Sequence, residues 1–499
     1  MSVEVNIMEK KVVKYKLVRH RWPDEIQADR KRKMRKAMVV AICVVFFFGG
    51  FGINELLNKR NSINDETFTK FAEIYNIMSE QFYFGKDKEN FNDALLNGAI
   101  EGMVNAGEDE HTMYLDAQQS NSFTSSMEGS FVGIGVQYYE EKEDVFRITR
   151  VLNDSPAEKA GLQKGDQIYR IGNTICKDME TDELRELILG EEGSKVEIEV
   201  LRDKKHLVYN LERQKVNDSV YHEIYDGYAL LEISSFSETV GDSTGKALEK
   251  IKQANAKNLI LDLRNNGGGY LQAAQQIASY LLGEDVVIFK EKNRDGSIDP
   301  YKTNAGLEHY TFDKIVLLVN EETASAAEVL TAALKENLDN VVIVGTNTYG
   351  KGTVQYPLVF SDGSMLKYTT AEWITSKGKE INGVGIKPDI EVNLDPAFTT
   401  GAPKLNDDES YAADSVNPGA HSVQVYLKFL GYDVDRSDAY FSKQSGEALK
   451  QFQKDEGMKA DGIIDNEVID VLISKIAEEW NTNLEKNDLQ MKKAIELVK

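Results

Sequence analysis

The pattern of hydrophobic and polar positions changes along this chain, and each change predicts a different kind of structure. Residues 62–128 repeat apolar side chains at steps of three and four, beginning with Phe68 and Phe71, which is the spacing of amphipathic helices. Residues 129–213 hold short alternating runs broken by glycine and predict a small β-rich module. Residues 214–395 alternate short apolar runs with helical segments, which is typical of an α/β domain.

The α/β region should contain a central sheet covered by helices. We expect its strands at the apolar runs 229–233, 259–263, 315–319 and 341–344, and its helices at 244–255, 270–282 and 325–336. In the β-rich module we expect strands at 145–148, 165–171 and 195–200, with one helix at 182–189.

The last hundred residues predict three further parts. Residues 396–418 are polar with scattered glycine and proline, and they indicate a linker. Residues 419–475 predict a small helical module, and residues 476–499 an amphipathic helix that closes the chain.

One segment near the N-terminus has no polar face. Residues 37–53 contain no charge, and as a helix they would span about 25 Å, which is near the lower limit for crossing a bilayer. Six cations lie within 30–36, directly before this segment. We therefore predict an uncleaved transmembrane anchor that keeps the basic tail 1–36 in the cytoplasm and places the rest of the chain outside.

Composition narrows the possible functions. The chain has 499 residues, so several domains are expected, and its net charge is −23. Such a surface repels nucleic acid. Two distant cysteines exclude a disulfide framework. We expect no cofactor and no metal site.

Two motif matches fail in context. Residues 345–351 fit G-x-x-x-x-G-K, but Gly352 stands where a nucleotide-binding loop needs Ser or Thr, and the following residues read as a strand. Residues 241–245 fit G-x-S-x-G, but no buried strand leads into them. We interpret Ser243 or Thr244 as a helix N-cap.

A third candidate is Ser325, which follows an apolar strand and begins a helix. This places its hydroxyl at the carboxyl end of a strand, where open α/β sheets build their sites, and lets the next amide face an oxyanion. The alternative is a small residue that permits close helix packing. A second strand ends in the Gly-rich loop 262–269, whose backbone N–H groups can approach a ligand closely.

Together these elements resemble the C-terminal processing peptidases, also called tail-specific proteases, over about 71–393. The motifs that carry the resemblance are DLRNNGGG (262–269), NEETASAAEVLTAAL (320–334), GTNTYGKGTVQ (345–355) and TSKGKEINGVGIKPDIEV (375–392). The resemblance implies a serine endopeptidase whose catalytic residues are Ser325, Lys351 and Gln355, with an oxyanion hole formed by Gly268 and Ala326. Gly267 and Ala327 depart from frequent family choices, which puts the loop geometry in doubt.

This chemistry requires an uncharged lysine. A free lysine titrates near pH 10.4, and burial away from counter-charges lowers that value. The residues beside Lys351 carry no charge, and Gln355 can hold the amine by a hydrogen bond without stabilising the ammonium form.

The β-rich module resembles a PDZ domain inserted ahead of the protease core. Its carboxylate-binding loop would comprise Val132, Gly133, Ile134 and Gly135, and residues 155–166 carry a second signature. Such a loop captures a free chain terminus with backbone N–H groups. The alternative is a β-hairpin with glycine turns. The resemblance implies protein substrates with accessible C-terminal tails.

Residues 421–472 resemble a peptidoglycan-binding-like module, and a generic helical domain that forms dimer contacts remains an equal alternative. The sequence thus predicts a multidomain α/β serine protease of a bacterial envelope, anchored in the cell membrane with its catalytic part outside. Peptidoglycan and a second copy of the chain remain open as partners. The competing hypothesis is a catalytically silent scaffold that tethers partners through its PDZ and wall-binding modules.

Overall fold

A computed structural model describes residues 65–140, 145–177, 179–406 and 408–499. The chain divides into two compact units, residues 1–100 and residues 101–499. The predicted basic tail 1–36 and anchor 37–53 lie outside the described residues. Within the described ranges, every helix is too short or too polar to span a bilayer.

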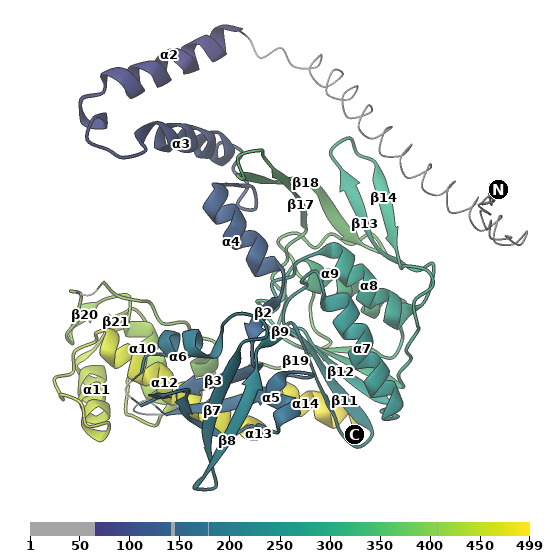
Figure 1. The fold of residues 1–499 in the computed structure, drawn as a ribbon, viewed down its shortest axis with the longest axis vertical. Coiled ribbons are helices and arrows are strands. Elements are labelled where there is room, and N and C mark those ends of the chain that lie inside the picture. Colours follow the sequence, from purple (N-terminus) through teal and green to yellow (C-terminus); the bar gives the residue numbers. More distant parts are fainter. Residues whose placement is uncertain (1–64, 141–144, 178, 407) are drawn as a thin grey trace, which may run out of the picture. The chain divides into compact units, whose positions relative to one another are not determined.

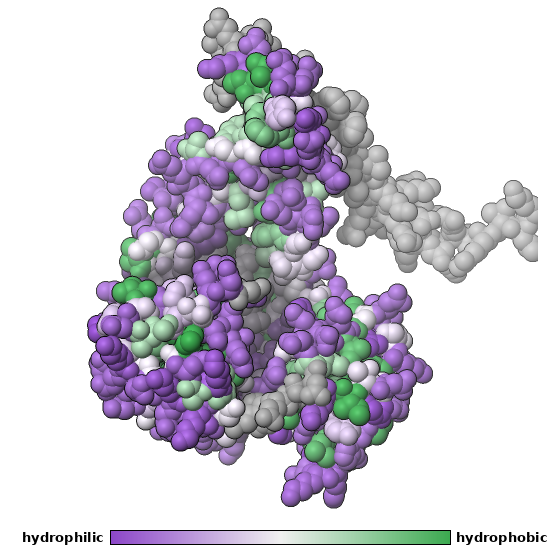
Figure 2. All heavy atoms as spheres, turned by 90° about the vertical axis from the view of Figure 1, so that its left-hand side faces the viewer, coloured by the Kyte–Doolittle hydropathy of each residue, from purple (hydrophilic) through white to green (hydrophobic). Residues whose placement is uncertain are grey.

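The described part of the N-terminal unit is helical, as its spacing predicts. It contains α2 (Asp65–Gln81), a 3-10 turn at Tyr83–Gly85 and the start of α3 (Phe91–Asn105). Several aromatic and aliphatic side chains of this unit are exposed, among them Phe68 and Tyr83, and Figure 2 shows such hydrophobic surface in green. Helical periodicity therefore identifies the elements correctly, although it does not bury their apolar sides within this unit.

The β-rich module forms an antiparallel sheet with the strand order β3-β4-β5-β7-β8, and β6 pairs with β5. Its elements are β3 (Val136–Glu140), β4 (Phe146–Val151), α5 (Pro156–Ala160), β5 (Gln167–Ile171), β6 (Thr174–Ile175), α6 (Thr181–Ile188), β7 (Lys195–Arg202) and β8 (Lys205–Glu212). Their inward side chains build a separate core that includes Phe146, Ile168 and Ile198. This confirms the predicted strands and the helix of the module.

The α/β region contains a six-stranded sheet with the order β10-β11-β12-β15-β16-β19, parallel from β11 onward. Its strands are β10 (Val220–Ile224), β11 (Tyr228–Ile233), β12 (Asn258–Asp262), β15 (Lys314–Val319), β16 (Val341–Gly345) and β19 (Ile390–Glu391). Helices α7 (Val240–Gln253), α8 (Leu271–Leu282) and α9 (Ala326–Asn337) pack on one face (Figure 1). The carboxyl ends of β12, β15 and β16 therefore lead into neighbouring loops.

A second sheet adjoins these loops. It joins β1 (Met113–Leu115), β18 (Met365–Thr375), β13 (Val287–Asn293) and β14 (Ile298–Lys302), with β17 (Thr353–Val359) also paired to β18. Strand β1 lies within the region predicted as wholly helical, between α3 and α4 (Ala117–Met127). The difference arises because β18 supplies an edge far along the chain that local periodicity cannot reveal.

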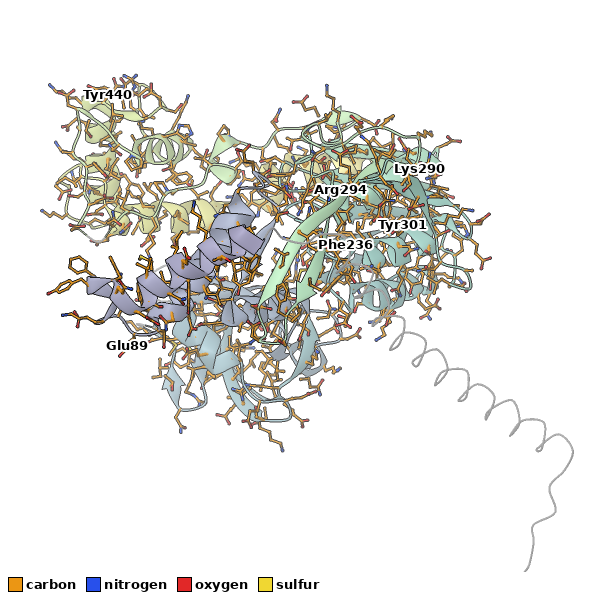
Figure 3. The ribbon with its side chains drawn as sticks, turned by 90° about the horizontal axis from the view of Figure 1, so that it is seen from above. Glu89, Phe236, Lys290, Arg294, Tyr301 and Tyr440 are labelled. Carbon is orange, nitrogen blue, oxygen red and sulfur yellow. The ribbon has the colours of Figure 1, made fainter. Side chains whose placement is uncertain are left out.

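The C-terminal module has its own core. It contains η2 (Pro396–Phe398), β20 (Ser415–Val416), α10 (Ala420–Phe429), β21 (Tyr440–Phe441), α11 (Lys443–Asp455) and α12 (Asn466–Thr482). The polar stretch 396–418, predicted as a linker, packs against this module, since Ala397 and Leu405 are buried in its core. Figure 3 labels Tyr440 at the edge of this module.

Two local predictions are wrong. Helix α7 begins at Val240 with Thr239 at its N-cap, so Ser243 and Thr244 lie inside the helix and neither caps it. The predicted single helix 476–499 is divided into the end of α12, the short α13 (Leu484–Asn487) and α14 (Leu489–Val498). Helix α14 covers the second face of the central sheet beside β12 and β15 (Figure 1).

Candidate active site

Ser325 stands between β15 and α9 in a conformation that few residues adopt. It is the N-cap of α9, with φ 54° and ψ −117°, and it is partly exposed between the buried Ala324 and Ala326. A positive φ at a residue with a side chain costs about 1–3 kcal/mol and persists only where the surroundings hold it. A sharp strand-to-helix turn of this kind presents a side chain at the edge of the sheet.

The surroundings that hold Ser325 centre on Glu328. This carboxylate is fully buried and forms a capping box with Ser325, accepting the Ser325 N–H at 2.9 Å. The same oxygen accepts the Lys351 N–H at 2.9 Å, and the other oxygen accepts the Gly350 N–H at 2.7 Å and the Thr348 hydroxyl. One carboxylate therefore ties the serine turn to the lysine loop. Glu328 is not among the residues predicted for the site, although S-x-x-E before an apolar run is the signature of a capping box.

The Gly-rich loop touches the serine turn at Gly268. This residue has φ 97°, and a Cβ there would lie 2.8 Å from the Ser325 Cβ and 3.0 Å from the Ala326 nitrogen, so no other residue fits. The Gly268 N–H donates to Asn266 Oδ1 at 2.9 Å, and its carbonyl accepts from the N–H of the buried Phe236. Figure 3 labels Phe236. The structure thus brings Gly268, Ser325 and Ala326 together, with the Gly268 N–H engaged inside its own loop.

Lys351 precedes β17 and is half-buried. Burial lowers the pKa of its amine, and the nearby Lys367 lowers it further, while Asp109, Glu110 and Glu328 act in the opposite direction. The uncharged sequence neighbours of Lys351 predict an amine that is isolated from counter-charges. In the structure, three carboxylates act on this amine, so that prediction is wrong. The net effect still favours the neutral amine relative to a free lysine.

Gln355 lies in β17 and uses its side-chain amide locally. It donates to the hydroxyls of Thr353 and Thr369 at 2.7 Å and 3.2 Å. Within the part of the chain that the structure describes, no hydrogen bond joins the Ser325 hydroxyl, the Lys351 amine and the Gln355 amide to one another. Glu328 thus joins the backbones of Ser325 and Lys351, and Gln355 lies in β17 four residues after Lys351, but the three predicted catalytic side chains are not linked.

Comparison with known proteins identifies these parts. Residues 227–392 match Peptidase family S41, residues 147–202 a PDZ domain, residues 417–472 a peptidoglycan-binding domain, and residues 52–119 the N-terminal domain of the activating protease CtpB. The carboxy-terminal processing protease CtpA of Bacillus subtilis (strain 168) is 34% identical over 93% of this chain and 96% of its own length. This chain belongs to the C-terminal processing proteases of peptidase family S41. It is a serine-type peptidase with a multidomain α/β architecture that includes a PDZ domain.

Two further known proteins are similar to this C-terminal processing protease. CtpB of the same organism is 30% identical over 92% of this chain and 98% of its own length. Among solved structures, the photosystem II D1 C-terminal processing protease covers 62% of this chain and 83% of that chain, at 27% identity and a TM-score of 0.37. At that TM-score the structural likeness adds nothing to the assignment, which rests on the sequence relatives.

The PDZ domain of this protease borders a cavity of about 570 Å³. The cavity lining is mixed. Phe131, Val136, Tyr138, Ile188 and Leu189 form its apolar part, and several serines, Gln137, Arg185 and Asp218 form its polar part. The predicted carboxylate-binding residues lie at this end of the domain. Val132 and Gly133 are in β2 (Ser130–Gly133), paired with β9 (Gln214–Asn217), whereas Ile134 is fully buried and Gly135 connects to β3. Residues of β2 and of α6 therefore both line this cavity.

The segment before β1 reaches the protease site through a chain of hydroxyls. Thr112 Oγ1 donates to Asp109 at 2.6 Å and accepts the Thr369 N–H at 3.0 Å, and Thr369 in turn accepts from Gln355. His111 is half-buried, and burial together with Lys351 lowers the pKa of its imidazole. These contacts indicate a structural role for His111, since its side chain donates no hydrogen bond to a catalytic candidate within the described residues.

The charges around Lys351 predict two opposite shifts in the pH profile of this protease. A lysine base must be neutral, so the predicted role of Lys351 implies that activity rises with pH through the pKa of this residue. In Lys367→Gln the loss of a nearby cation should raise that pKa and move the rise in kcat/KM to higher pH. In Glu110→Gln the loss of an anion should move it to lower pH. Profiles measured at low salt test this, and equal shifts in one direction would contradict it.

Proposed function

We propose that Ser325 is the nucleophile of this protease, Lys351 its general base, and Gln355 the residue that orients the amine. The observation that supports this assignment most strongly is the Glu328 carboxylate, which binds the N–H groups of both Ser325 and Lys351. A serine needs a neighbouring base, and fixing both backbones to one buried group places the two side chains on the same edge of the sheet.

The proposed reaction proceeds in two steps. Lys351 Nζ takes the Ser325 hydroxyl proton as the serine oxygen attacks the substrate carbonyl carbon, and the N–H groups of Gly268 and Ala326 stabilise the oxyanion. The C–N bond then breaks, and the leaving amine takes the proton from Lys351. Water attacks the acyl-serine ester with Lys351 again accepting a proton, which passes to the serine oxygen as the acid product leaves.

Two local hydrogen bonds must exchange for this reaction. The Gly268 N–H must turn from Asn266 toward the oxyanion, and the Gln355 amide must turn from Thr353 and Thr369 toward Lys351. Catalytic hydrogen bonds are often long or misaligned before substrate binds. We therefore propose that substrate binding completes the site.

We further propose that the PDZ domain captures the free C-terminus of the substrate through Val132, Gly133, Ile134 and Gly135. The apolar part of the cavity lining beside this loop suits an apolar C-terminal side chain. A backbone loop that binds a carboxylate loses its charge-assisted hydrogen bonds when the terminus is neutral.

Amidating the C-terminus of an unfolded protein substrate should therefore raise KM about tenfold or more while leaving kcat nearly unchanged. The measurement compares the two forms of one substrate with the full-length protease. Equal KM values for both forms would rule out terminal capture and leave the Ser325 assignment intact.

Residues 37–53 and 417–472 support a proposal for location. We propose that the first segment anchors the protease in the cell membrane, with the catalytic part outside the cytoplasm, and that the second binds the wall. Cell fractionation of the full chain and of a form lacking residues 37–53 tests the anchor, and an unchanged membrane fraction would contradict it. Membership of a peptidase family, with both Ser325 and Lys351 present, favours this enzyme over a silent scaffold.

A further inference from the structure

A buried group of charges lies beneath the Gly-rich loop, on the sheet face opposite α7 to α9. Glu232 and Asp262 are neighbours in register at the ends of the parallel strands β11 and β12, so their side chains share a face. Glu232 is bound by both guanidinium nitrogens of Arg150 at 2.7 Å and 2.8 Å. Glu232 is thus already paired by an arginine of the PDZ domain.

Arg264 has its partners on the same face. Its guanidinium binds Asp262 at 2.6 Å and forks onto Asp488 at 2.8 Å and 3.0 Å. The side chains of Arg264, Asp262 and Asp488 are only 13%, 7% and 6% exposed. Bidentate pairs of this kind fix geometry as well as contributing energy, and removing one partner of a buried pair leaves the other charge poorly compensated.

Asp488 belongs to the C-terminal segment, 224 positions from Arg264. It is the N-cap of α14 and accepts the Met491 N–H at 2.9 Å. The helix is fixed to the sheet by apolar contacts of Ala494 and Val498 with Leu230, Ile260 and Val316. At its far end, Asn258 Nδ2 donates to the Val498 carbonyl at 2.8 Å and Lys314 Nζ to the Leu497 carbonyl at 3.0 Å. Helix α14 is therefore an outer layer of the protease core.

Arg264 also lies in the loop that contacts Ser325, two residues after the end of β12 at Asp262. Its own N–H donates to Asp262 Oδ1, and the next residues, Asn265 and Asn266, bond to Asn320 and to the Ala324 N–H. Gly268 follows two residues later, against the Ser325 Cβ. The position of the guanidinium thus sets where this short loop leaves the strand.

We propose that Asp488 is a positioning residue of this protease: through Arg264 it holds the Gly-rich loop against the Ser325 turn. The inference rests on the proposed function for its effect on catalysis, and on the hydrogen bonds alone for its effect on the loop. It gives the N-cap of the C-terminal helix, which follows the peptidoglycan-binding-like module in sequence, a role in positioning the loop.

Asp488→Asn in the full-length chain tests this role, because asparagine keeps an oxygen for the N-cap, removes the charge and replaces one of the two oxygens that bind Arg264 with an NH₂ group. The matched control is Glu496→Gln, which removes a carboxylate from an exposed position of the same helix, where among the described residues it pairs only with Lys493. We expect Asp488→Asn to lower kcat at least tenfold with KM within twofold, and Glu496→Gln to leave both unchanged. A purely structural role would lower Tm without changing kcat per folded molecule.

Amide hydrogen exchange gives a readout that does not depend on activity. The Ala324 N–H, which bonds to the Asn266 carbonyl at 2.9 Å, should exchange at least tenfold faster in Asp488→Asn, while amides of β16 stay protected as in the control. If neither kcat nor Ala324 exchange differs from the control, the inference is overturned. If the wild-type chain cleaves nothing yet Ala324 exchange responds, the proposed function fails and the positioning of the loop stands.

Discussion

Replacing Ser325 by alanine is expected to lower kcat by about 10⁴-fold or more, because no other group can form the acyl intermediate. The change also removes an N-cap side chain, which costs about 1 kcal/mol of stability, so the variant should remain folded. Cleavage of an unfolded, tailed protein substrate by purified enzyme measures the effect, with circular dichroism as the check on folding.

Ser243→Ala is the matched control for this experiment. Ser243 lies in the second serine motif, inside α7, where its hydroxyl accepts from Asn217. Activity of this variant should equal that of the wild type. Retained cleavage in Ser325→Ala, or lost cleavage in Ser243→Ala with the fold intact, would assign the chemistry to a different serine.

Replacing Glu328 by glutamine should lower kcat about 100-fold and the free energy of unfolding by about 2–5 kcal/mol. The carboxylate accepts three backbone N–H groups and one hydroxyl, whereas a glutamine offers one oxygen and turns an NH₂ toward two of the donors. Each buried N–H left unpaired costs about 1–3 kcal/mol. The separation of the Ser325 and Lys351 backbones should change as well, and a displacement of about 1 Å can cost about 100-fold in rate.

Glu336→Gln separates the two effects of this change. Glu336 lies on the same helix, α9, with a side chain 6% exposed, and binds Thr375, Ser376 and the Lys377 N–H. Its replacement should lower stability with little change in kcat. If Glu328→Gln and Glu336→Gln lower kcat equally, the hydrogen bonds of Glu328 to the Ser325 and Lys351 backbones do not contribute specifically to catalysis.

Local patterns predict the central sheet well. Each predicted strand of this sheet overlaps an observed one, at the apolar runs 229–233, 259–263, 315–319 and 341–344. A strand that is buried on both faces is a continuous apolar run, so it can be recognised in the sequence without knowledge of its partner strands. Ser325 and the loop before Gly268 are found for the same reason, since each follows such a strand. Strand β1 is missed because its pairing depends on β18, more than 250 positions away.

The structure adds what depends on contacts distant in sequence. In the sequence, Glu328 is only an acidic residue in an apolar helix, and the structure shows the four donors that it binds. In the sequence, Asp488 is only a polar residue near the C-terminus, and the structure shows that it binds Arg264. The sequence motifs predict Gly268 and Gln355 as site residues. Only the structure shows that the Gly268 N–H donates to Asn266 and that the Gln355 side-chain amide donates to Thr353.

The most direct test of the central claim, that Ser325 is the nucleophile, is to trap the acyl-enzyme. The full-length protease is mixed with a tailed peptide substrate, quenched with acid within the first turnover, and digested for mass spectrometry. We predict that the peptide containing Ser325 gains the mass of the N-terminal substrate fragment on the serine oxygen, and that Ser325→Ala shows no adduct. An adduct on another residue, or rapid cleavage with an adduct-free Ser325 in every quenched sample, would contradict the account.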